Sequence, residues 1–267
     1  MNFLLFLLCL SLSQAQPGKP VLPSRLEQSV VTPVTDAIAG AEDIEAIIAP
    51  IRTEIRASFE LPLVNAPKGL FKGRSSEENL LGYWISDALR ARSSELLGGP
   101  VEFAITNRGG IRANLRGGML KVGDIFEVMP FDNELIVMDL TGAEVLQVIT
   151  EGLLRRGGEP CSGVKVTMGG SLQKPIITAT WDDGSPIDPK ALVRVATTDY
   201  LFNGGDALPT LKKGRRPFLT GLPVRQVLLD ACTQLAQQKR DLVAPKGGRY
   251  TFSPEITTAL SQKRHGF

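Results

Sequence analysis

Two segments of the sequence share one pattern and indicate the class of fold. Residues 101–112 read VEFAITNRGGIR, and residues 192–206 read LVRVATTDYLFNGGD. Each segment begins as an apolar strand and ends in an asparagine close to two glycines. Glycine lets the backbone approach a ligand closely and adopt positive φ angles. The repeated pattern therefore predicts two strands whose ends carry loops suited to binding a ligand.

Polar and charged side chains accompany the glycines in both loops. Arginine can bind a phosphate or a carboxylate with two hydrogen bonds, and aspartate can accept hydrogen bonds from a ribose diol. A single loop of this kind would also fit a simple tight turn, but the occurrence of two favours a site. The candidate binding residues in the loops are Asn107, Gly109, Gly110, Arg112, Asn203, Gly205 and Asp206.

Two aromatic residues lie near these loops in the sequence. Phe131 follows a proline in the segment PFDN (residues 130–133), and Tyr200 precedes the second glycine pair. Two rings beside polar loops can hold a flat base between them. The same rings could instead pack in the hydrophobic core, and the residues alone leave these alternatives open.

Helices and strands are expected to alternate around the loops. Pro50 should kink or split a helix over residues 42–59, and the segment SSEE (residues 75–78) fits a capping box for the next helix. The order of the elements predicts an α+β (mixed α/β) fold with mixed sheets layered with helices. Further helices are expected over 142–156 and 223–238, and strands over 101–105, 134–140, 164–168, 176–181, 192–202 and 249–252.

Composition narrows the functional classes. The 267 residues are 43% hydrophobic and 22% charged, with a formal net charge of +2. This is the composition of a soluble globular protein, without the concentrated basic surface of a nucleic-acid-binding protein. The single histidine, His265, lies near the C-terminus. Hydrolytic metal centres and Ser-His-Asp sites need histidine within the fold, so we expect no catalytic residue, metal ligand or cofactor in this chain.

The first residues predict export. Met1–Leu12 is almost entirely apolar, and Ser13-Gln14-Ala15 provides the small residues that precede a signal-peptidase cleavage site. The alternative is a membrane anchor, but the apolar run is shorter than the roughly 20 residues that span a bilayer. We expect a periplasmic or extracellular protein without a stable membrane span. Cleavage would leave Cys161 and Cys232, either as a disulfide or as buried thiols.

Four segments, in order, give the sequence a family resemblance. They are ENLLGYWISDAL (78–89), ITNRGGIR (105–112), GDIFEVMPFDN (123–133) and DYLFNGGD (199–206). Together they resemble the C-terminal domain of the 5'-nucleotidase / UDP-sugar hydrolase family. The resemblance implies that this part of the chain binds a nucleoside or nucleotide.

The resemblance also implies roles for individual residues. The family's two stacking rings fall on Phe131 and Tyr200, where Tyr200 replaces the usual phenylalanine and Phe202 is the alternative ring. Contacts to the base and to the ribose or phosphate fall on Asn107 and Arg112, and the contact to the ribose hydroxyls falls on Asp206.

The family's upstream arginine has no clear counterpart. Glu77 occupies that position, with Arg74 nearby.

In this family a metallophosphatase domain with two metal ions precedes the nucleoside-binding domain. Residues 16–73 contain no histidine, and residues 42–73 resemble the connector between the two domains. The sequence therefore predicts a signal peptide (1–15), an extended lead-in (16–41), a connector helix and loop (42–73), a nucleotide-binding domain (74–252) and a mobile tail (253–267).

Three functions remain open after this comparison. The chain could be the recognition part of a 5'-nucleotidase, inactive alone, which acts in nucleotide catabolism with a separately encoded metallophosphatase that supplies the divalent metals. It could also be a non-enzymatic periplasmic binding protein for nucleosides or nucleotides. A structural domain that has lost its ligand is disfavoured, because Asn107, Arg112, Phe131 and Asp206 are all present.

Overall fold

The computed structural model describes residues 33–35, 37–73, 77–171 and 173–262. The chain divides into two units, residues 1–48 and 49–267. Helix α1 (Glu42–Phe59) has the bounds that the sequence predicts and continues through Pro50 without a break. The expected signal peptide lies outside the described residues. Within the described part, no helix combines the length and apolar character needed to cross a membrane.

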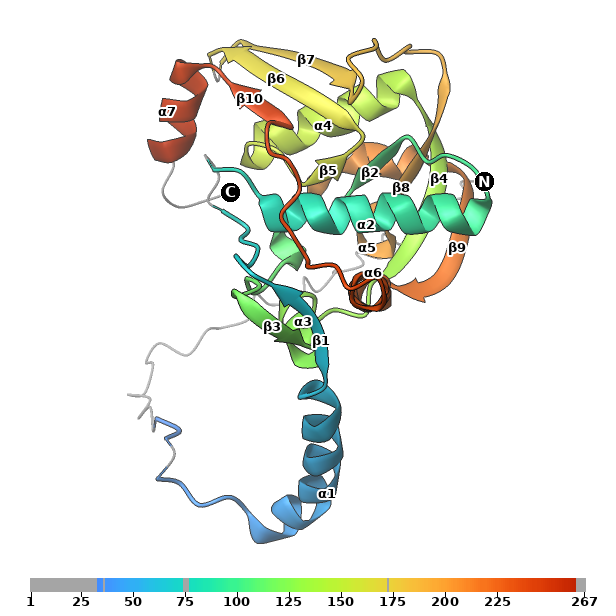
Figure 1. Ribbon diagram of the computed structural model, residues 1–267. Coiled ribbons are helices and arrows are strands. Elements are labelled where there is room, and N and C mark those ends of the chain that lie inside the picture. Colours follow the sequence, from blue (N-terminus) through green and yellow to red (C-terminus); the bar gives the residue numbers. More distant parts are fainter. Residues whose placement is uncertain (1–32, 36, 74–76, 172, 263–267) are drawn as a thin grey trace, which may run out of the picture. The chain divides into compact units, whose positions relative to one another are not determined.

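A five-stranded mixed sheet forms the centre of the second unit (Figure 1). Strands β2 and β8 are parallel, and the remaining neighbours are antiparallel. The strands in spatial order are β5 (Cys161–Ser162), β2 (Phe103–Ile105), β8 (Leu192–Thr198), β4 (Glu134–Thr141) and β9 (Arg215–Pro223). This mixed sheet with helices confirms the predicted α+β class.

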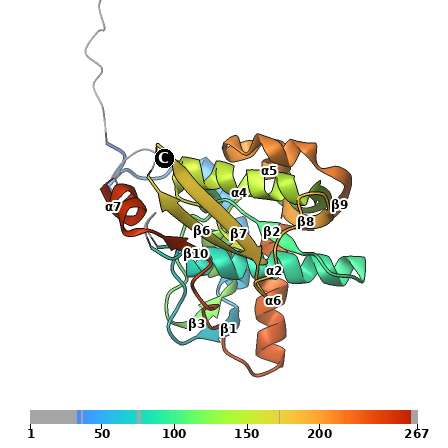
Figure 2. The ribbon, with the colours of Figure 1, turned by 90° about the horizontal axis from the view of Figure 1, so that it is seen from above.

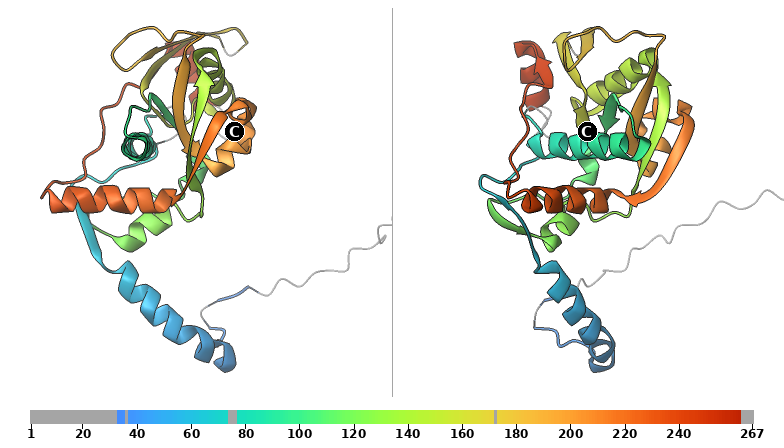
Figure 3. Two further views of the ribbon diagram at one scale, coloured as in Figure 1. Left: turned by 90° about the vertical axis from the view of Figure 1, so that its right-hand side faces the viewer. Right: turned by 45° about the vertical axis from the view of Figure 1, so that its right-hand side comes forward.

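The two faces of this sheet cover two separate hydrophobic cores. Because side chains alternate along a strand, Phe103 and Ile105 enter one core and Ala104 enters the other. The core on the Ala104 side is closed by helices, including α2, which is seen end-on beside the strands in Figure 3 (left). Its elements are α2 (Leu80–Leu97), α3 (Val122–Val128), α6 (Val224–Gln237), β1 (Pro62–Ala66) and β3 (Gly118–Lys121).

A second sheet and several helices close the core on the Phe103 side. Helix α4 (Gly142–Arg156) begins at a Thr141–Glu144 capping box and ends at Gly157, as the sequence indicates. The second sheet has the order β10 (Tyr250–Phe252), β6 (Val164–Gly170), β7 (Pro175–Trp181), and Figure 2 shows it from above.

The C-terminal segment differs from the predicted mobile tail. Residues 254–262 form helix α7, which packs beside β6 and β10. Ile256 and Leu260 of this helix are buried in the same core as Phe103. Two apolar side chains one helical turn apart are a weak periodic signal, so the sequence did not reveal this helix.

The later part of the region assigned to the connector also belongs to the domain. Strand β1, which the sequence analysis placed in a loop, pairs with β3, and its Val64 and Ala66 are buried. The second helix begins at Leu80, with Asn79 as its N-cap, instead of near Ser75. Ser75 and Ser76 of the expected capping box lie outside the described residues. Strand β8 ends at Thr198, and residues 199–202 form the short helix α5.

Cys161 and Cys232, the cysteines within the described residues, do not form a disulfide. Cys161 is buried in the core on the Phe103 side, whereas Cys232 is buried in the core on the opposite face. Burial raises the pKa of the Cys161 thiol to about 11 and that of Cys232 to about 12. Neither thiol forms the reactive thiolate near neutral pH.

Candidate functional site

Three loops meet at one edge of the central sheet. Strands β2 and β8 are parallel neighbours, so the loops at their carboxyl ends leave the sheet at the same edge. Strand β4 is antiparallel to β8, and Leu135 near its start pairs with Thr198 at the end of β8. The segment before β4, which carries Phe131, therefore reaches the same edge. The topology explains why residues about 100 positions apart face one another.

These loops enclose an open cavity of about 350 Å³. Seven of the nine predicted binding residues line it, whereas Asn203 and Gly205 do not. Two lining residues, Asn133 and Arg156, were not among the predicted ones. The full lining is Asn107, Gly109, Gly110, Arg112, Phe131, Asn133, Arg156, Tyr200 and Asp206.

Both predicted aromatic rings lie on the cavity wall instead of in the core. Phe131 is 46% exposed and Tyr200 is 44% exposed. Phe202, the alternative ring, packs against the core on the Phe103 side. Exposed aromatic side chains at a cavity are suited to stacking on a planar ligand.

Charged side chains fix the two segments that carry these rings. Arg225 of α6 donates to the carbonyl oxygen of Met129 at 3.1 Å and to Asp132 at 2.5 Å, and it stacks on Phe126. The Oδ1 atom of Asp199 accepts from the backbone N–H groups of both Glu134 and Tyr200, at 3.1 and 2.8 Å. The start of β4 and the short helix α5 are thereby tied to one carboxylate.

Asp206 lies at the centre of a polar network. Its Oδ2 accepts from Asn107 Nδ2 at 2.5 Å, and its Oδ1 accepts from Arg156 Nη2 at 3.0 Å. Arg155 Nη1 lies 3.0 Å from the same Oδ1 atom. The backbone of Asp206 and Ala207 is in the left-handed region, with φ angles of 52° and 51°. Contacts that hold this carboxylate therefore also support an unfavourable backbone conformation.

Two of the predicted glycines are needed because their neighbours fill the space of a side chain. A Cβ atom at Gly205 would lie 2.5 Å from the ring of Tyr200, and one at Gly110 would lie 2.9 Å from Asn107 Oδ1. Asn203 caps the short helix α5 by donating to the carbonyl oxygen of Asp199 at 2.9 Å. Gly205 and Asn203 thus shape the loop without lining the cavity.

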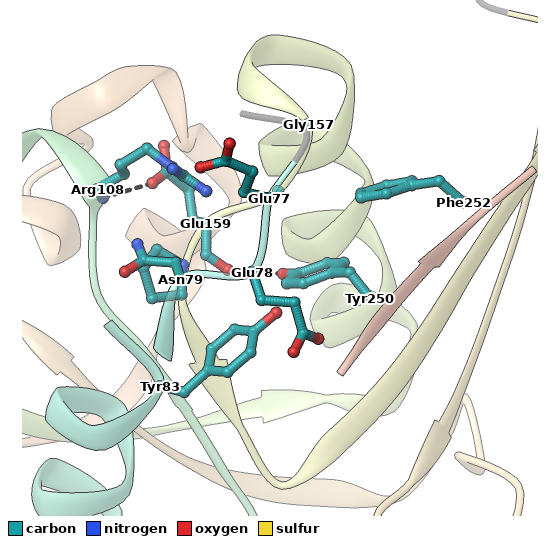
Figure 4. Close-up of a pocket in the computed structure, with 11 residues that line it drawn as sticks. Glu77, Glu78, Asn79, Tyr83, Arg108, Gly157, Glu159, Tyr250 and Phe252 are labelled. Carbon is teal, nitrogen blue, oxygen red and sulfur yellow. Dashed lines mark hydrogen bonds between the residues drawn. The ribbon is translucent and has the colours of Figure 1, made fainter. Parts of the chain in front are cut away.

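A smaller cavity of about 50 Å³ borders Arg108 of the first glycine loop (Figure 4). The backbone N–H of Arg108 donates to Glu159 at 2.7 Å, and its guanidinium donates to the carbonyl oxygens of Lys72 and Gly73. Burial raises the pKa of Glu159 and lowers that of Arg108. These contacts anchor the loop that carries Asn107.

The upstream position expected to bind the ligand faces this smaller cavity. Glu77 is one of its lining residues and is not part of the cavity that holds Phe131. Arg74 lies outside the described residues. Among the residues that the structure describes, no group of three or more His, Cys, Asp or Glu side chains is placed to hold a metal ion.

Comparison with known proteins places this chain in a family. A family model described as the 5'-nucleotidase C-terminal domain matches residues 64–213. The chain belongs to this family. The match covers the three loops of the cavity and begins within β1, which supports including that strand in the domain.

Relatives of this chain are longer proteins. Cell wall protein Lmo0130 of Listeria monocytogenes is 30% identical over 239 residues, which cover 84% of this chain and 30% of that protein. The trifunctional nucleotide phosphoesterase protein YfkN of Bacillus subtilis is 34% identical over 144 residues, or 50% of this chain and 10% of that protein. A 5'-nucleotidase precursor from Thermus thermophilus superposes with a TM-score of 0.67 and 27% identity, covering 79% of this chain and 43% of that one.

Helix α4, which ends in Arg155 and Arg156, is stabilised at its start by an ion pair. Arg215 donates to both oxygens of Glu144, and this contact lowers the pKa of Glu144 from 4.5 to about 2. Because the folded-state pKa is depressed, the ion pair stabilises the fold above pH 4.5 and is lost as the pH falls towards 2.

We therefore expect Glu144→Gln to reduce the free energy of unfolding at pH 7, by an amount that solvent screening keeps small because Arg215 is exposed. The difference from the wild type should shrink as the pH is lowered towards 2. Urea unfolding at several pH values measures it. Glu95→Gln, which removes an exposed pair with Arg92, is the control and should show no such pH-dependent difference. A constant difference across this range would contradict the assignment.

Proposed function

We propose that this domain binds a nucleoside or nucleotide in the cavity at the sheet edge. The base lies between Phe131 and Tyr200, the ribose faces Asp206, and Arg112 and Asn107 contact polar groups of the ligand. One observation carries the proposal: two half-exposed rings, a carboxylate and an arginine line the same cavity. Stacking provides affinity for any base, and the charged groups orient the sugar.

The domain would recognise the substrate in a hydrolytic reaction of nucleotides. In this proposal a metallophosphatase, separately encoded, supplies the divalent metals and the activated water, and the present chain needs no cofactor of its own. Support comes from membership of a 5'-nucleotidase domain family and from relatives of which this chain covers a minority. The alternative is a binding protein for nucleosides or nucleotides without an enzymatic partner.

Export from the cell is compatible both with a recognition subunit of a nucleotidase and with a non-enzymatic binding protein. The apolar segment at residues 1–12 and the small residues after it favour a signal peptide. One relative is a cell wall protein by name. We propose that the protein acts in the periplasm or outside the cell.

Calorimetry with the purified protein tests the binding function. We expect adenosine or uridine, or their 5'-monophosphates, to bind with a dissociation constant of roughly micromolar to millimolar, because phosphate contacts to metal are not provided by this domain. With Mn²⁺ or Co²⁺ the protein alone should not hydrolyse AMP or UDP-glucose. Absence of binding for all these ligands would disprove the proposed binding function. Hydrolysis that persists after stringent purification would disprove the proposal that a separate metallophosphatase carries out the catalysis.

Isolation of the native protein from the cell envelope distinguishes the two versions. A co-purified metallophosphatase, with metal-dependent 5'-nucleotidase activity in the complex, is expected for the recognition subunit. Nucleotide binding by a protein that purifies without such activity would favour the non-enzymatic alternative.

A further inference from the structure

Glu159 is a fully buried carboxyl group that contacts the first glycine loop. It lies in the segment between the end of α4 and β5 (Figure 4). Its Oε2 atom accepts from the backbone N–H of Arg108 at 2.7 Å. Arg108 stands between Asn107 and Gly109, which both line the cavity at the sheet edge. One oxygen of Glu159 therefore holds the backbone of the cavity wall.

The hydrogen bonding of Glu159 favours its ionised form. A proton on Oε2 would compete with the N–H of Arg108 for that oxygen, and a neutral acid is in any case a weaker acceptor than a carboxylate. The other oxygen, Oε1, has no hydrogen-bond partner among the described residues, and Arg156 Nη1 lies 3.9 Å from it. The loop is thus held most firmly when Glu159 carries its charge.

Burial acts in the opposite direction. Removal from water is the main cause that raises the pKa of Glu159, and the negative charge of Asp206 adds to this increase. The N–H of Arg108 and the guanidinium of Arg156 oppose it. Glu159 therefore changes its charge closer to neutral pH than an exposed glutamate does.

Glu159 faces charged and titratable groups from every element around it. They belong to the two glycine loops, α4, β10 and the start of α2, and they are Arg108, Asp206, Arg156, Tyr250, Tyr83, Glu77 and Glu78. The two tyrosines have raised pKa values and stay neutral when Glu159 titrates.

A second connection runs from Glu159 to the same loop through side chains. Arg156 faces Glu159 with Nη1 and donates from Nη2 to Asp206 at 3.0 Å. Asp206 in turn accepts from Asn107 at 2.5 Å. The charge of Glu159 therefore acts on the wall of the larger cavity both through the backbone of Arg108 and through Arg156.

We propose that Glu159 is a positioning residue whose ionisation makes ligand binding in the sheet-edge cavity depend on pH. The carboxylate holds the first glycine loop in the binding conformation, and the neutral acid holds it less firmly. Affinity is reduced when fewer molecules are in the binding conformation, so acidification weakens binding. Glu159 itself lines the smaller cavity and not the larger one. This inference rests on the proposed function, because the affinity for a nucleoside reports the state of the loop.

Calorimetry with adenosine tests the inference between about pH 5 and pH 8, where adenosine is uncharged. We expect the affinity of the wild type to fall about fivefold towards the acid end, the difference between a charged and a neutral hydrogen-bond acceptor. By linkage, binding at intermediate pH should release protons, which makes the measured enthalpy depend on the buffer.

Glu159→Gln keeps an oxygen that can accept from the N–H of Arg108 but does not titrate. Its affinity should stay near the acidic wild-type value at every pH. The other groups of the site are the same in both proteins, so the comparison of the two profiles isolates Glu159. Equal slopes in the wild type and in Glu159→Gln would overturn the inference and leave the proposed function intact.

Asp139→Asn is the matched control. Asp139 of β4 is also buried and pairs with Arg216, but it does not line the cavity. The variant should keep the wild-type pH profile. If it lost the slope as Glu159→Gln does, a general charge effect would explain the profile and the inference would be wrong.

The backbone amide resonance of Arg108 provides a second measurement that needs no ligand. Its proton shift should follow the ionisation of Glu159 in the wild type and stay constant in Glu159→Gln. A wild-type amide that does not titrate would overturn the inference, also if Glu159→Gln fails to fold. If no nucleoside binds to a protein that melts normally, the proposed function fails, and this amide alone decides whether Glu159 is a pH-dependent anchor of the loop.

Discussion

Phe131→Ala is expected to weaken nucleoside binding by about 1–3 kcal/mol, the usual contribution of one aromatic residue stacked on a base. The ring is 46% exposed at the cavity wall and contributes little to the core. The melting temperature should therefore change only slightly. Calorimetry with adenosine and a thermal melt of the same preparation measure the two effects.

Phe218→Ala is the matched control for this variant. Phe218 lies in β9 and is 44% exposed, almost as much as Phe131, but it does not line the cavity. Its replacement should leave nucleoside affinity unchanged. If Phe131→Ala lowered the melting temperature strongly while affinity stayed at the wild-type value, the ring would be a packing residue and the stacking role would be wrong.

Asp206→Asn is expected to reduce both stability and binding. The substitution keeps the shape of the side chain but removes the carboxylate that faces Arg155 and Arg156, and Asp206 itself is only 9% exposed. Removing one partner of a largely buried ion pair costs about 1–3 kcal/mol in the free energy of unfolding. Nucleoside affinity should fall about tenfold, because the carboxylate no longer accepts from the ribose.

Asp182→Asn provides the comparison, since Asp182 pairs with Arg90 at the surface at 3.4 Å. Its replacement should change neither quantity appreciably. An Asp206→Asn protein that melts at the wild-type temperature and binds the nucleoside with wild-type affinity would remove Asp206 from the site. It would also weaken the assignment of the neighbouring loop residues.

Much of the site could be predicted from the sequence because the residues that mark each loop are close together in the sequence. A strand followed by Asn and two glycines is visible in the residues themselves, and both such loops reach the same cavity. Arg156 was missed because a basic residue in the last turn of a helix is explained by the helix dipole alone. The partner of the Arg156 guanidinium is Asp206, 50 residues further along the chain, and only the folded structure brings the two side chains together.

Strands β1, β3 and β9 were not predicted from the sequence because the local pattern of each is weak. Strand β9 contains Pro217 and Gly221, which usually argue against a strand. It is the outermost strand of the central sheet and pairs only with β4, so these residues do not interrupt hydrogen bonds to a second neighbouring strand. Strands β1 and β3 pair only with each other and are four or five residues long. Their pairing depends on contacts distant in the sequence, and alternation over so few residues cannot indicate it.

The meeting of three loops at one sheet edge has a consequence for folding. Asn107 and Asp206, which share a hydrogen bond, are separated by 99 residues, and their loops lie together because β2 and β8 pair as parallel neighbours. A contact of such long sequence separation closes late, because the entropy of the intervening chain must be lost first. The unfolded chain therefore lacks this cavity, and any ligand of the cavity stabilises the native state by mass action alone. A nucleotide, as the ligand proposed for this cavity, would thus favour the completed fold while the chain is folding.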